Sequence, residues 1–295
     1  MSMEMMKQSE DLWTKFVSTG KVEDYLKYRT ETKNSSSGTD LFGREETMAE
    51  TVTFTGMVLI ASPMKEYDKR IEVLTKERGR ISAFVRGARK PNSALSACTV
   101  PFTFGKFTFY EGRNAYNLVS GEIGTYFEEI TTDYDALCYA SYFAEMIQYF
   151  SREGIEAAEE LILMYVTMRA LKHRLISFSL IRVIFEMRLM MIEGESIEVF
   201  GCLRCGNKEA YSVYLSEGGL ICTECAAKEK KFANEYPLKL GADAKYTLQY
   251  ILTSPMEKLY AFTVTDKVLE ELKRFMKSYL ARYLPHKFKT LDFIV

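Results

Sequence analysis

Histidine is nearly absent from this chain of 295 residues, and the common phosphate-binding loops are absent altogether. The two histidines, His173 and His286, lie far apart in the sequence, which leaves little for a histidine-based proton relay or a metallohydrolase site. The sequence has no glycine-rich loop of the P-loop or dinucleotide type. Acidic pairs such as Glu128-Glu129 are adjacent and point in different directions, so a solvated face explains them better than a catalytic pair. We find no catalytic constellation and expect no enzyme.

Long apolar runs and a strong net charge are also lacking. The longest apolar region, residues 161–192, is interrupted by charged side chains, so we expect no membrane span. The formal net charge of −1 indicates no partner by itself. Few cysteines and no secretory leader favour a reducing cytoplasm. A chain of 295 residues exceeds the usual size of a single core, so we expect two or three domains.

Four of the six cysteines form two Cys-x-x-Cys knuckles, and sixteen residues separate them. Four thiolates at this spacing can close a tetrahedral shell around one Zn²⁺. The segments around Gly218-Gly219 predict a hairpin that carries one knuckle to the other. A shell filled by protein leaves no open position for a substrate, so we expect one structural zinc per chain. Its predicted ligands are Cys202, Cys205, Cys222 and Cys225.

Two other interpretations of the knuckles are weaker. A thioredoxin-like redox site needs one knuckle at a helix start within a βαβ unit, and no such unit is apparent. Small buried cysteines rarely occur as paired knuckles. Outside the knuckles only Cys98 and Cys138 remain, both in apolar contexts.

The first 47 residues differ in composition from the rest of the chain. Residues 34–38 have the composition of a flexible linker. The short pattern from Trp13 to Leu26 predicts a small helix–turn–helix at most, and it resembles a family of short uncharacterised bacterial proteins. We expect either an appended segment with short helices, the main protein beginning near Met48, or a disordered extension.

Residues 48–128 have the alternating pattern of β-strands. Five short strands with internal glycines predict a small closed barrel of the OB type. Val52–Leu59 is interrupted by Gly56, which suggests a bulge in the first strand. The last two strands are expected to pair across residues 111–114.

From Asp133 onward the apolar period is helical. Helices are expected over residues 137–150, 161–171, 180–192, 242–252 and 267–283, with Ser177 or Ser179 capping the third. The knuckles interrupt this series. The expected fold is therefore multidomain α+β, with the barrel at 48–128, a helical domain at 129–198 and 230–295, and an inserted zinc ribbon at 199–229.

The barrel sequence contains a strongly basic window. Residues 65–90 contain nine basic and four acidic side chains in a chain that is nearly neutral. Such a patch attracts phosphates through counterion release. Phe84, Phe107, Phe109 and Tyr110 could offer faces for base stacking, although most of the phenylalanines are expected in the core. The basic candidates taken from this window are Lys65, Lys69, Arg70, Arg80, Arg86, Arg89 and Lys90.

The order of these parts resembles the bacterial RecO family across residues 48–295. Three segments carry the resemblance: Thr55-Gly56-Met57-Val58-Leu59, the stretch from Thr75 through Arg86-Gly87-Ala88-Arg89-Lys90, and Phe185-Glu186-Met187-Arg188-Leu189 shortly before Cys202-Leu203-Arg204-Cys205-Gly206. The resemblance implies a non-catalytic DNA-repair protein with a barrel, a helical domain and a zinc ribbon. It also implies that Lys287 and Lys289 belong to a basic, DNA-binding C-terminal segment, which is less basic here than in the family.

The resemblance further implies partners and a place of action. These are single- and double-stranded DNA, RecR, the acidic tail of single-stranded-DNA-binding protein and, indirectly, RecA, all in the cytoplasm on the nucleoid. The expected activity is the annealing of complementary strands and help in loading RecA. Two alternatives stay open: an RNA- or ribosome-associated module of an OB barrel and a zinc ribbon, and a zinc enzyme whose site lies outside the knuckles.

Overall fold

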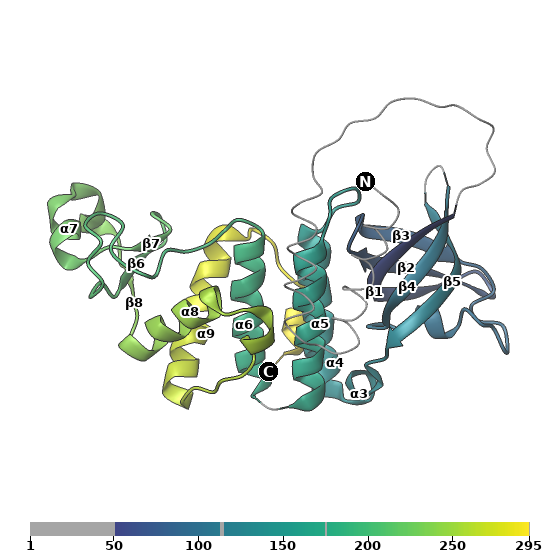
Figure 1. Cartoon of the computed structure of the whole chain (residues 1–295). Coiled ribbons are helices and arrows are strands. Elements are labelled where there is room, and N and C mark those ends of the chain that lie inside the picture. Colours follow the sequence, from purple (N-terminus) through teal and green to yellow (C-terminus); the bar gives the residue numbers. More distant parts are fainter. Residues whose placement is uncertain (1–50, 113–114, 175, 295) are drawn as a thin grey trace, which may run out of the picture. The chain divides into compact units, whose positions relative to one another are not determined.

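The computed structural model describes residues 51–112, 115–174 and 176–294 (Figure 1). They form two compact units. The first unit comprises residues 51–73 and 81–126, and the second comprises Leu74–Arg80 and residues 127–294. The predictions for residues 1–47 and for the hairpin tip at 113–114 lie outside the described residues. Each unit is described by itself.

The first unit is a closed five-stranded barrel. Its strands are β1 (Thr51–Met64), β2 (Asp68–Thr75), β3 (Gly79–Val85), β4 (Phe104–Glu111) and β5 (Tyr116–Thr125). They follow the order β1-β2-β3-β5-β4, and β3 runs parallel to β5. Alternate residues of β3 point inward, where they join Phe107 and Phe109 in an apolar core. The predicted α+β fold class with an OB-like barrel is confirmed.

The pairing of β1 with β4 shows no bulge at Gly56. The register between β1 and β4 runs without a shift from Thr51 opposite Tyr110 to Met57 opposite Phe104, and Gly56 faces Gly105. The irregularities lie instead between β4 and β5, one of them beside Gly105. A Cβ atom on Gly105 would lie 2.3 Å from the Glu122 carbonyl oxygen. Glycine is therefore needed in β4, where two backbones approach closely.

The second unit is built around six α-helices and their caps. They are α3 (Glu128–Thr132), α4 (Tyr134–Phe150), α5 (Ala158–His173), α6 (Phe178–Ile192), α8 (Ala242–Thr253) and α9 (Asp266–Tyr283). Ser177 caps α6, because its Oγ accepts a hydrogen bond from the Leu180 N–H at 3.3 Å. Every residue of α6 from Val183 to Met190 is buried, since α4, α5, α8 and α9 all contact this helix.

A small ribbon (residues 198–240) lies between α6 and α8 in the sequence. It contains β6 (Ser212–Tyr214), β7 (Gly219–Leu220), β8 (Leu238–Lys239), α7 (Thr223–Lys228) and the 3₁₀ helix η2 (Lys230–Asn234). β6 pairs with β7 as the predicted hairpin, and β8 pairs with the other edge of β6. In Figure 1 the chain leaves the ribbon through β8 and leads directly into α8. Short 3₁₀ helices also occur at η1 (Ala97–Thr99), η3 (Met256–Lys258) and η4 (Thr290–Phe293).

Side chains of the helices hold the ribbon by its backbone. The Gln249 side chain donates to the Val199 carbonyl at 2.7 Å, and the Tyr283 hydroxyl donates to the Leu215 carbonyl at 2.8 Å. Lys245 donates to the carbonyl of Lys208. These contacts fix the ribbon to α8 and α9 within the second unit. In the described part of the chain, no helix has the length and apolarity required to cross a membrane.

Candidate metal centre and nucleic-acid interface

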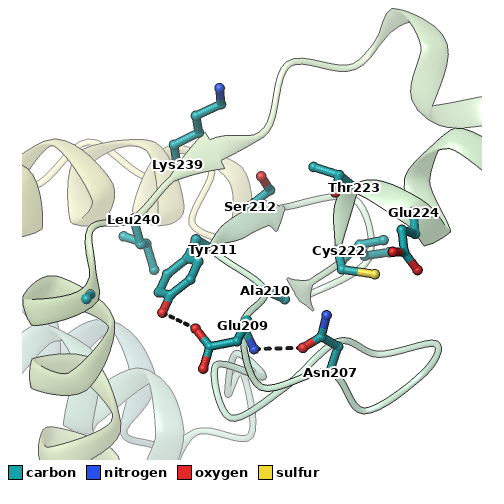
Figure 2. A pocket seen from close by; sticks show the side chains of 12 residues that line it. Asn207, Glu209, Ala210, Tyr211, Ser212, Cys222, Thr223, Glu224, Lys239 and Leu240 are labelled. Carbon is teal, nitrogen blue, oxygen red and sulfur yellow. Dashed lines mark hydrogen bonds between the residues drawn. The ribbon is translucent and has the colours of Figure 1, made fainter.

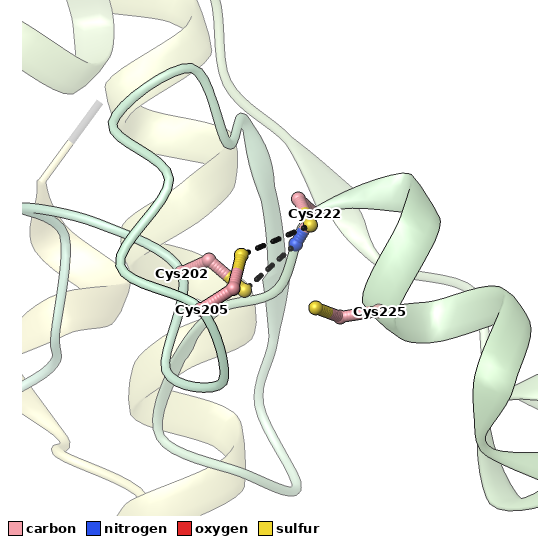
Figure 3. A group of neighbouring side chains, drawn as sticks. All are labelled: Cys202, Cys205, Cys222 and Cys225. Carbon is pink, nitrogen blue, oxygen red and sulfur yellow. Dashed lines mark hydrogen bonds between the residues drawn. The ribbon is translucent and has the colours of Figure 1, made fainter.

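The two knuckles bring four sulfur atoms together in the ribbon (Figure 3). Cys202 and Cys205 lie on the loop before β6, Cys222 precedes α7, and Cys225 lies in the first turn of that helix. All four Sγ atoms lie within 4.8 Å of one another. The hairpin β6–β7 therefore performs the predicted task of carrying one knuckle to the other.

The sulfur positions fit a single tetrahedral metal ion. Zinc–sulfur bonds of about 2.3 Å at tetrahedral angles place sulfurs about 3.8 Å apart. The Sγ atoms of Cys205 and Cys222 lie 3.7 Å apart. Four sulfur donors favour zinc or an iron–sulfur centre over hard cations. The four cysteines can therefore hold a metal ion without rearrangement of the fold.

Backbone donors prepare one of the four thiols as a ligand. Burial raises the pKa of Cys202, but N–H donors of Cys222, Arg204 and Cys205 outweigh it and lower this pKa to about 6. Cys222 N and Arg204 N lie 3.3 Å and 3.5 Å from its sulfur. By contrast, hydrogen bonds to Cys222 and Cys205 raise the pKa of Cys225 to about 12. A bound metal would replace the protons that the thiols share.

A network of ion pairs closes over the first knuckle. Arg204, inside that knuckle, donates to Glu217 at 2.6 Å and to Glu229 at 2.8 Å. Lys231 binds the same two carboxylates at 2.5 Å and 3.4 Å. The network ties the knuckle loop to the turn after β6 and to the residue that follows α7. The charges of Arg204 and Lys231 are therefore committed to the ribbon itself.

A pocket beside the sulfur cluster is lined by Tyr211, Cys222 and Glu209 among others (Figure 2). Its polar groups bind one another. The Glu209 N–H donates to Asn207 at 2.9 Å, and the Tyr211 hydroxyl donates to Glu209 at 2.7 Å, which raises the pKa of Tyr211. Figure 2 shows Lys239 rising from β8 away from Tyr211 and Cys222. This pocket gives no support to the zinc-enzyme alternative.

The barrel gathers four of the predicted basic residues on one surface. The β1–β2 turn meets the loop that follows β3, because Arg89 N donates to the Tyr67 carbonyl at 2.9 Å and Gly87 N donates to Asp68 at 2.8 Å. Gly87 has φ of +66°, a conformation that favours glycine in this tight loop. We call this the basic loop surface. Its basic members are Lys65, Arg86, Arg89 and Lys90, all exposed, and the β1–β2 turn also carries the exposed Glu66.

Tyr67 belongs to the basic loop surface and was missed by the sequence reasoning. Its side chain is 43% exposed, and Lys90 Nζ lies 5.9 Å from its ring centroid. An exposed aromatic among cations is typical of nucleic-acid contacts. The sequence signal that could have identified Tyr67 is its position inside the basic window of residues 65–90. The aromatics selected from the strands differ: Phe107 and Phe109 are buried in the core, Phe84 is half-buried and Tyr110 is exposed.

Three other candidates from the basic window lie apart from the basic loop surface or bind protein groups. Lys69 donates to the Thr99 hydroxyl at 2.9 Å, and Arg70 donates to the Ser82 hydroxyl at 2.8 Å. Arg80 belongs to the second unit, where it donates to the Ser151 carbonyl at 3.4 Å. Side chains that point out of the pleat or contact other elements cannot all meet on one face.

The C-terminal candidates lie on the segment that follows α9. Lys287 forms an exposed ion pair with Asp292 at 3.0 Å. The Lys289 side chain is exposed, while its N–H donates to Glu145 on α4 at 3.0 Å. Glu145 also accepts from Thr290 N at 2.9 Å, so it holds the start of η4 against α4. Both lysines therefore belong to the second unit, on a segment fixed by hydrogen bonds.

Two family models match the chain in tandem. The model described as "Recombination protein O N terminal" matches residues 48–127, and "Recombination protein O C terminal" matches residues 131–292. Among similar curated proteins is the "DNA repair protein RecO" of Acetivibrio thermocellus, 30% identical over 81% of this chain and 94% of that protein. The protein of the same name from Clostridium acetobutylicum is 29% identical over 81% of this chain and 95% of its own length. With the barrel and the helical unit both matched, the chain belongs to the RecO family.

Proposed function

We propose that this protein is a DNA-binding recombination mediator in DNA repair that works without catalytic turnover. The observation that carries the proposal is the basic loop surface, where four exposed cations lie on the two joined loops and one of them, Lys90, lies over the Tyr67 ring. In the described part of the chain, none of these cations is ion-paired with a carboxylate. Membership of the RecO family, whose similar curated members are named as DNA repair proteins, supports the same conclusion.

The basic loop surface suits strand annealing. Annealing requires neutralisation of two polyanions while their base edges stay free, so phosphate contacts suffice and sequence readout is unnecessary. Lysine and arginine on a loop bind phosphates without entering a groove. Tyr67 would hold one base by stacking and thus keep a strand in place. Lys69, Arg70, Arg80, Lys287 and Lys289 remain secondary candidates for contacts to the strand.

The four-cysteine cluster holds one structural zinc ion in this proposal. Protein sulfurs would fill its coordination shell, and the bound metal would supply cross-linking of the knuckles rather than chemistry. Cys202 is prepared for this role by backbone N–H donors to its sulfur. The Arg204 network would then hold the loop around the metal.

A cavity in the helical unit suits the acidic tail of single-stranded-DNA-binding protein. The cavity of about 410 Å³ lies among α4, α6, α9 and the C-terminal segment. Tyr139, Val183 and Met276 contribute apolar surface, and Arg274 and Lys277 of α9 contribute unpaired positive charge, whereas Lys273 is paired with Glu270. An acidic peptide with an apolar end needs this combination. On this basis the protein binds that tail and, with RecR, helps load RecA in the cytoplasm on the nucleoid.

The tail site is tested with a fluorescent peptide of the tail sequence and the full chain. Lys277→Glu should weaken peptide binding about tenfold or more, because a repulsive charge replaces an unpaired attractive one at the cavity. Lys267→Glu on the same helix lies outside the cavity lining and should leave binding unchanged. Equal effects of the two substitutions would remove the site from this cavity.

Binding and annealing of oligonucleotides test the main proposal. The full chain should bind single-stranded DNA with an affinity that falls steeply as salt rises, and it should speed pairing of complementary strands. A matched RNA strand distinguishes the alternative of an RNA- or ribosome-associated module, since that alternative predicts a strong RNA preference. Binding that is absent or independent of salt would refute the proposal.

A further inference from the structure

The ribbon and the last long helix line a groove separate from the cavity proposed for the acidic tail, although Arg274 and Lys277 border both. The β8–α9 groove has a volume of about 790 Å³ and lies between residues 236–241, which include β8, and one face of α9. Arg274, Phe275 and Lys277 line it from the helix. Leu240 and Phe275 are buried and form an apolar floor. The groove lies entirely within the second unit.

The free charges of the β8–α9 groove are positive. Lys239, Arg274 and Lys277 line it, and none of them forms an ion pair in the described part of the chain. The neighbouring Lys273 differs, because Glu270 binds it at 2.7 Å. The single carboxylate of the groove, Glu271, accepts a hydrogen bond from Gly241 N at the start of α8. Three cations therefore face one carboxylate that is already occupied.

An aromatic side chain stands at the groove with both faces open. Tyr236 is 96% exposed, more than any other large apolar or aromatic side chain in the described residues. An aromatic ring left fully in water gains nothing for the fold. Bases stack on such rings whatever their sequence. The groove thus repeats the composition of the basic loop surface, where Tyr67 lies among cations.

The strand that forms one wall favours nucleic acid over an added peptide strand. β8 has two residues, and Pro237 before it has no N–H to donate. In an antiparallel strand alternate residues point their backbone groups to opposite edges. Leu240 donates to Tyr211, and Leu238 lies opposite Val213, which leaves Lys239 as the one residue of β8 that could pair with a peptide. Side-chain charge, not backbone pairing, is what this edge offers.

We propose that the β8–α9 groove is a second contact site for single-stranded nucleic acid. Phosphates bind Lys239, Arg274 and Lys277, and one base stacks on Tyr236. The inference rests on the proposed DNA-binding function and extends it. Annealing brings two nucleic-acid strands together. A groove in the second unit lets one protein molecule contact a second strand in addition to the strand bound on the barrel.

Photo-crosslinking of the full chain to an oligo-dT strand carrying 5-iodouracil tests this site directly. Mass spectrometry should find a crosslinked peptide that contains Tyr236. The variant Tyr236→Ala/Lys239→Ala should lose that crosslink. Its affinity should fall about fivefold or more, through lost stacking and one lost phosphate contact. Arg274 and Lys277 stay intact in this variant, because they also line the cavity proposed for the acidic tail.

The matched control is Tyr246→Ala/Lys267→Ala. It removes a tyrosine that is 68% exposed and an exposed lysine from the same unit, outside the groove. Thermal unfolding checks that both variants fold. The proposal is overturned if no crosslink maps to Tyr236, or if the two variants bind the oligonucleotide equally. It is also overturned if the groove variant loses only binding of an acidic decapeptide, since the groove would then take peptides.

A parallel variant separates failure of this site from failure of the proposed function. Arg86→Ala/Arg89→Ala/Lys90→Ala removes three charges from the basic loop surface. Weaker binding in this barrel variant with unchanged binding in the groove variant would overturn the second site alone. A wild-type chain that does not bind the oligonucleotide would overturn the proposed function together with this inference.

Discussion

Several cations of the helical unit are ion-paired with carboxylates, whereas the cations of the basic loop surface are not. On α5, Lys172 binds Glu129 at 2.7 Å, and Arg174, which follows α5, binds Asp133. On α6, Arg182 binds the buried Glu186 at 2.7 Å. On the basic loop surface the nearby Asp68 accepts from Gly87 N instead, and the cations stay exposed. Density of charge in a sequence therefore does not show which charges a ligand can reach.

The two units also differ in what holds them together. The barrel closes its strands around an apolar core that includes Ile71, Phe107 and Phe109. The second unit adds polar and sulfur-based contacts to its helical core: the four cysteines, the Arg204 network, and Arg188, which donates to the carbonyls of Ile251 and Leu252 at 3.1 Å and 2.9 Å. Substitutions at these contacts should affect the second unit and leave the barrel intact.

Removal of a metal ligand should have the largest effect. Structural zinc contributes about 10–16 kcal/mol in small zinc-binding peptides, so Cys202→Ser should release the metal and unfold the ribbon. Metal content should fall to zero, and hydrogen exchange should become fast in β6 and β7 but stay slow in the barrel. Cys138→Ser, outside the cluster, is the control. A Cys202→Ser protein with slow exchange in β6 would contradict the structural role.

The buried carboxylate of α6 should have the next largest effect. Glu186 accepts hydrogen bonds from the Tyr142 hydroxyl and from Arg182, each at 2.7 Å. Glu186→Ala leaves both donors without this partner, and we expect a loss of about 3–5 kcal/mol in the free energy of unfolding of the helical unit. Denaturant titration followed by hydrogen exchange measures it. Glu186→Gln keeps the volume and one acceptor and should be milder; equal losses would show that the negative charge, which both variants lack, decides.

Tyr67 should matter for binding and not for folding. Tyr67→Ala on the basic loop surface should weaken binding of single-stranded DNA by about 1–3 kcal/mol through lost stacking. Fluorescence anisotropy measures the change. Tyr110→Ala is the control, because Tyr110 is equally exposed on the barrel at 44% but lies on β4. A larger loss at Tyr110 would place the bound strand on the barrel wall.

A half-buried carboxylate should make the helical unit weakly sensitive to pH. Burial and the charge of Glu160 raise the pKa of Glu193 from 4.5 to about 7. Below pH 4.5 the group is protonated whether the chain is folded or unfolded. As pH rises from 4.5 through 7, the group ionises in the unfolded chain but stays protonated in the folded chain. The free energy of unfolding therefore falls by roughly 1–2 kcal/mol after allowance for solvent screening.

Glu193→Gln tests this pH dependence. Thermal unfolding at pH 5 and pH 8 should differ less in the variant than in the wild type. The exposed Glu153→Gln in the same unit should leave the difference unchanged. An undiminished difference in Glu193→Gln would assign the pH dependence to other groups.

Much of the fold follows from local patterns in the sequence. The helical periods and the Ser177 cap were sufficient for α4, α5, α6, α8 and α9, because each buries one or more faces at regular spacing. The clustering of the four cysteines was predictable, since Cys-x-x-Cys spacing constrains geometry directly. β8 was not predicted: a two-residue strand has no period, and only tertiary pairing with β6 defines it.

The basic residues were the least predictable part of the candidate site. Lys69, Arg70 and Arg80 are as basic in the sequence as Arg86, yet they donate to Thr99, Ser82 and the Ser151 carbonyl in the fold. Those partners are 12 to 71 residues distant in the sequence. Tyr236 shows the converse, since nothing local indicates that this tyrosine will stay exposed. Long-range contacts decide which side chains remain available.

The central claim is that DNA binds the unpaired cations of the basic loop surface. Its most direct test compares the salt dependence of single-stranded DNA binding in two variants, each with three substitutions. Arg86→Ala/Arg89→Ala/Lys90→Ala should lower the slope of log affinity against log salt by about 2, at roughly 0.7 for each lost phosphate contact. Lys172→Ala/Arg174→Ala/Lys231→Ala removes three cations that are already ion-paired, and it should keep the wild-type slope. Equal slopes in the two variants would contradict the account, because paired and unpaired cations would then be equivalent for the DNA.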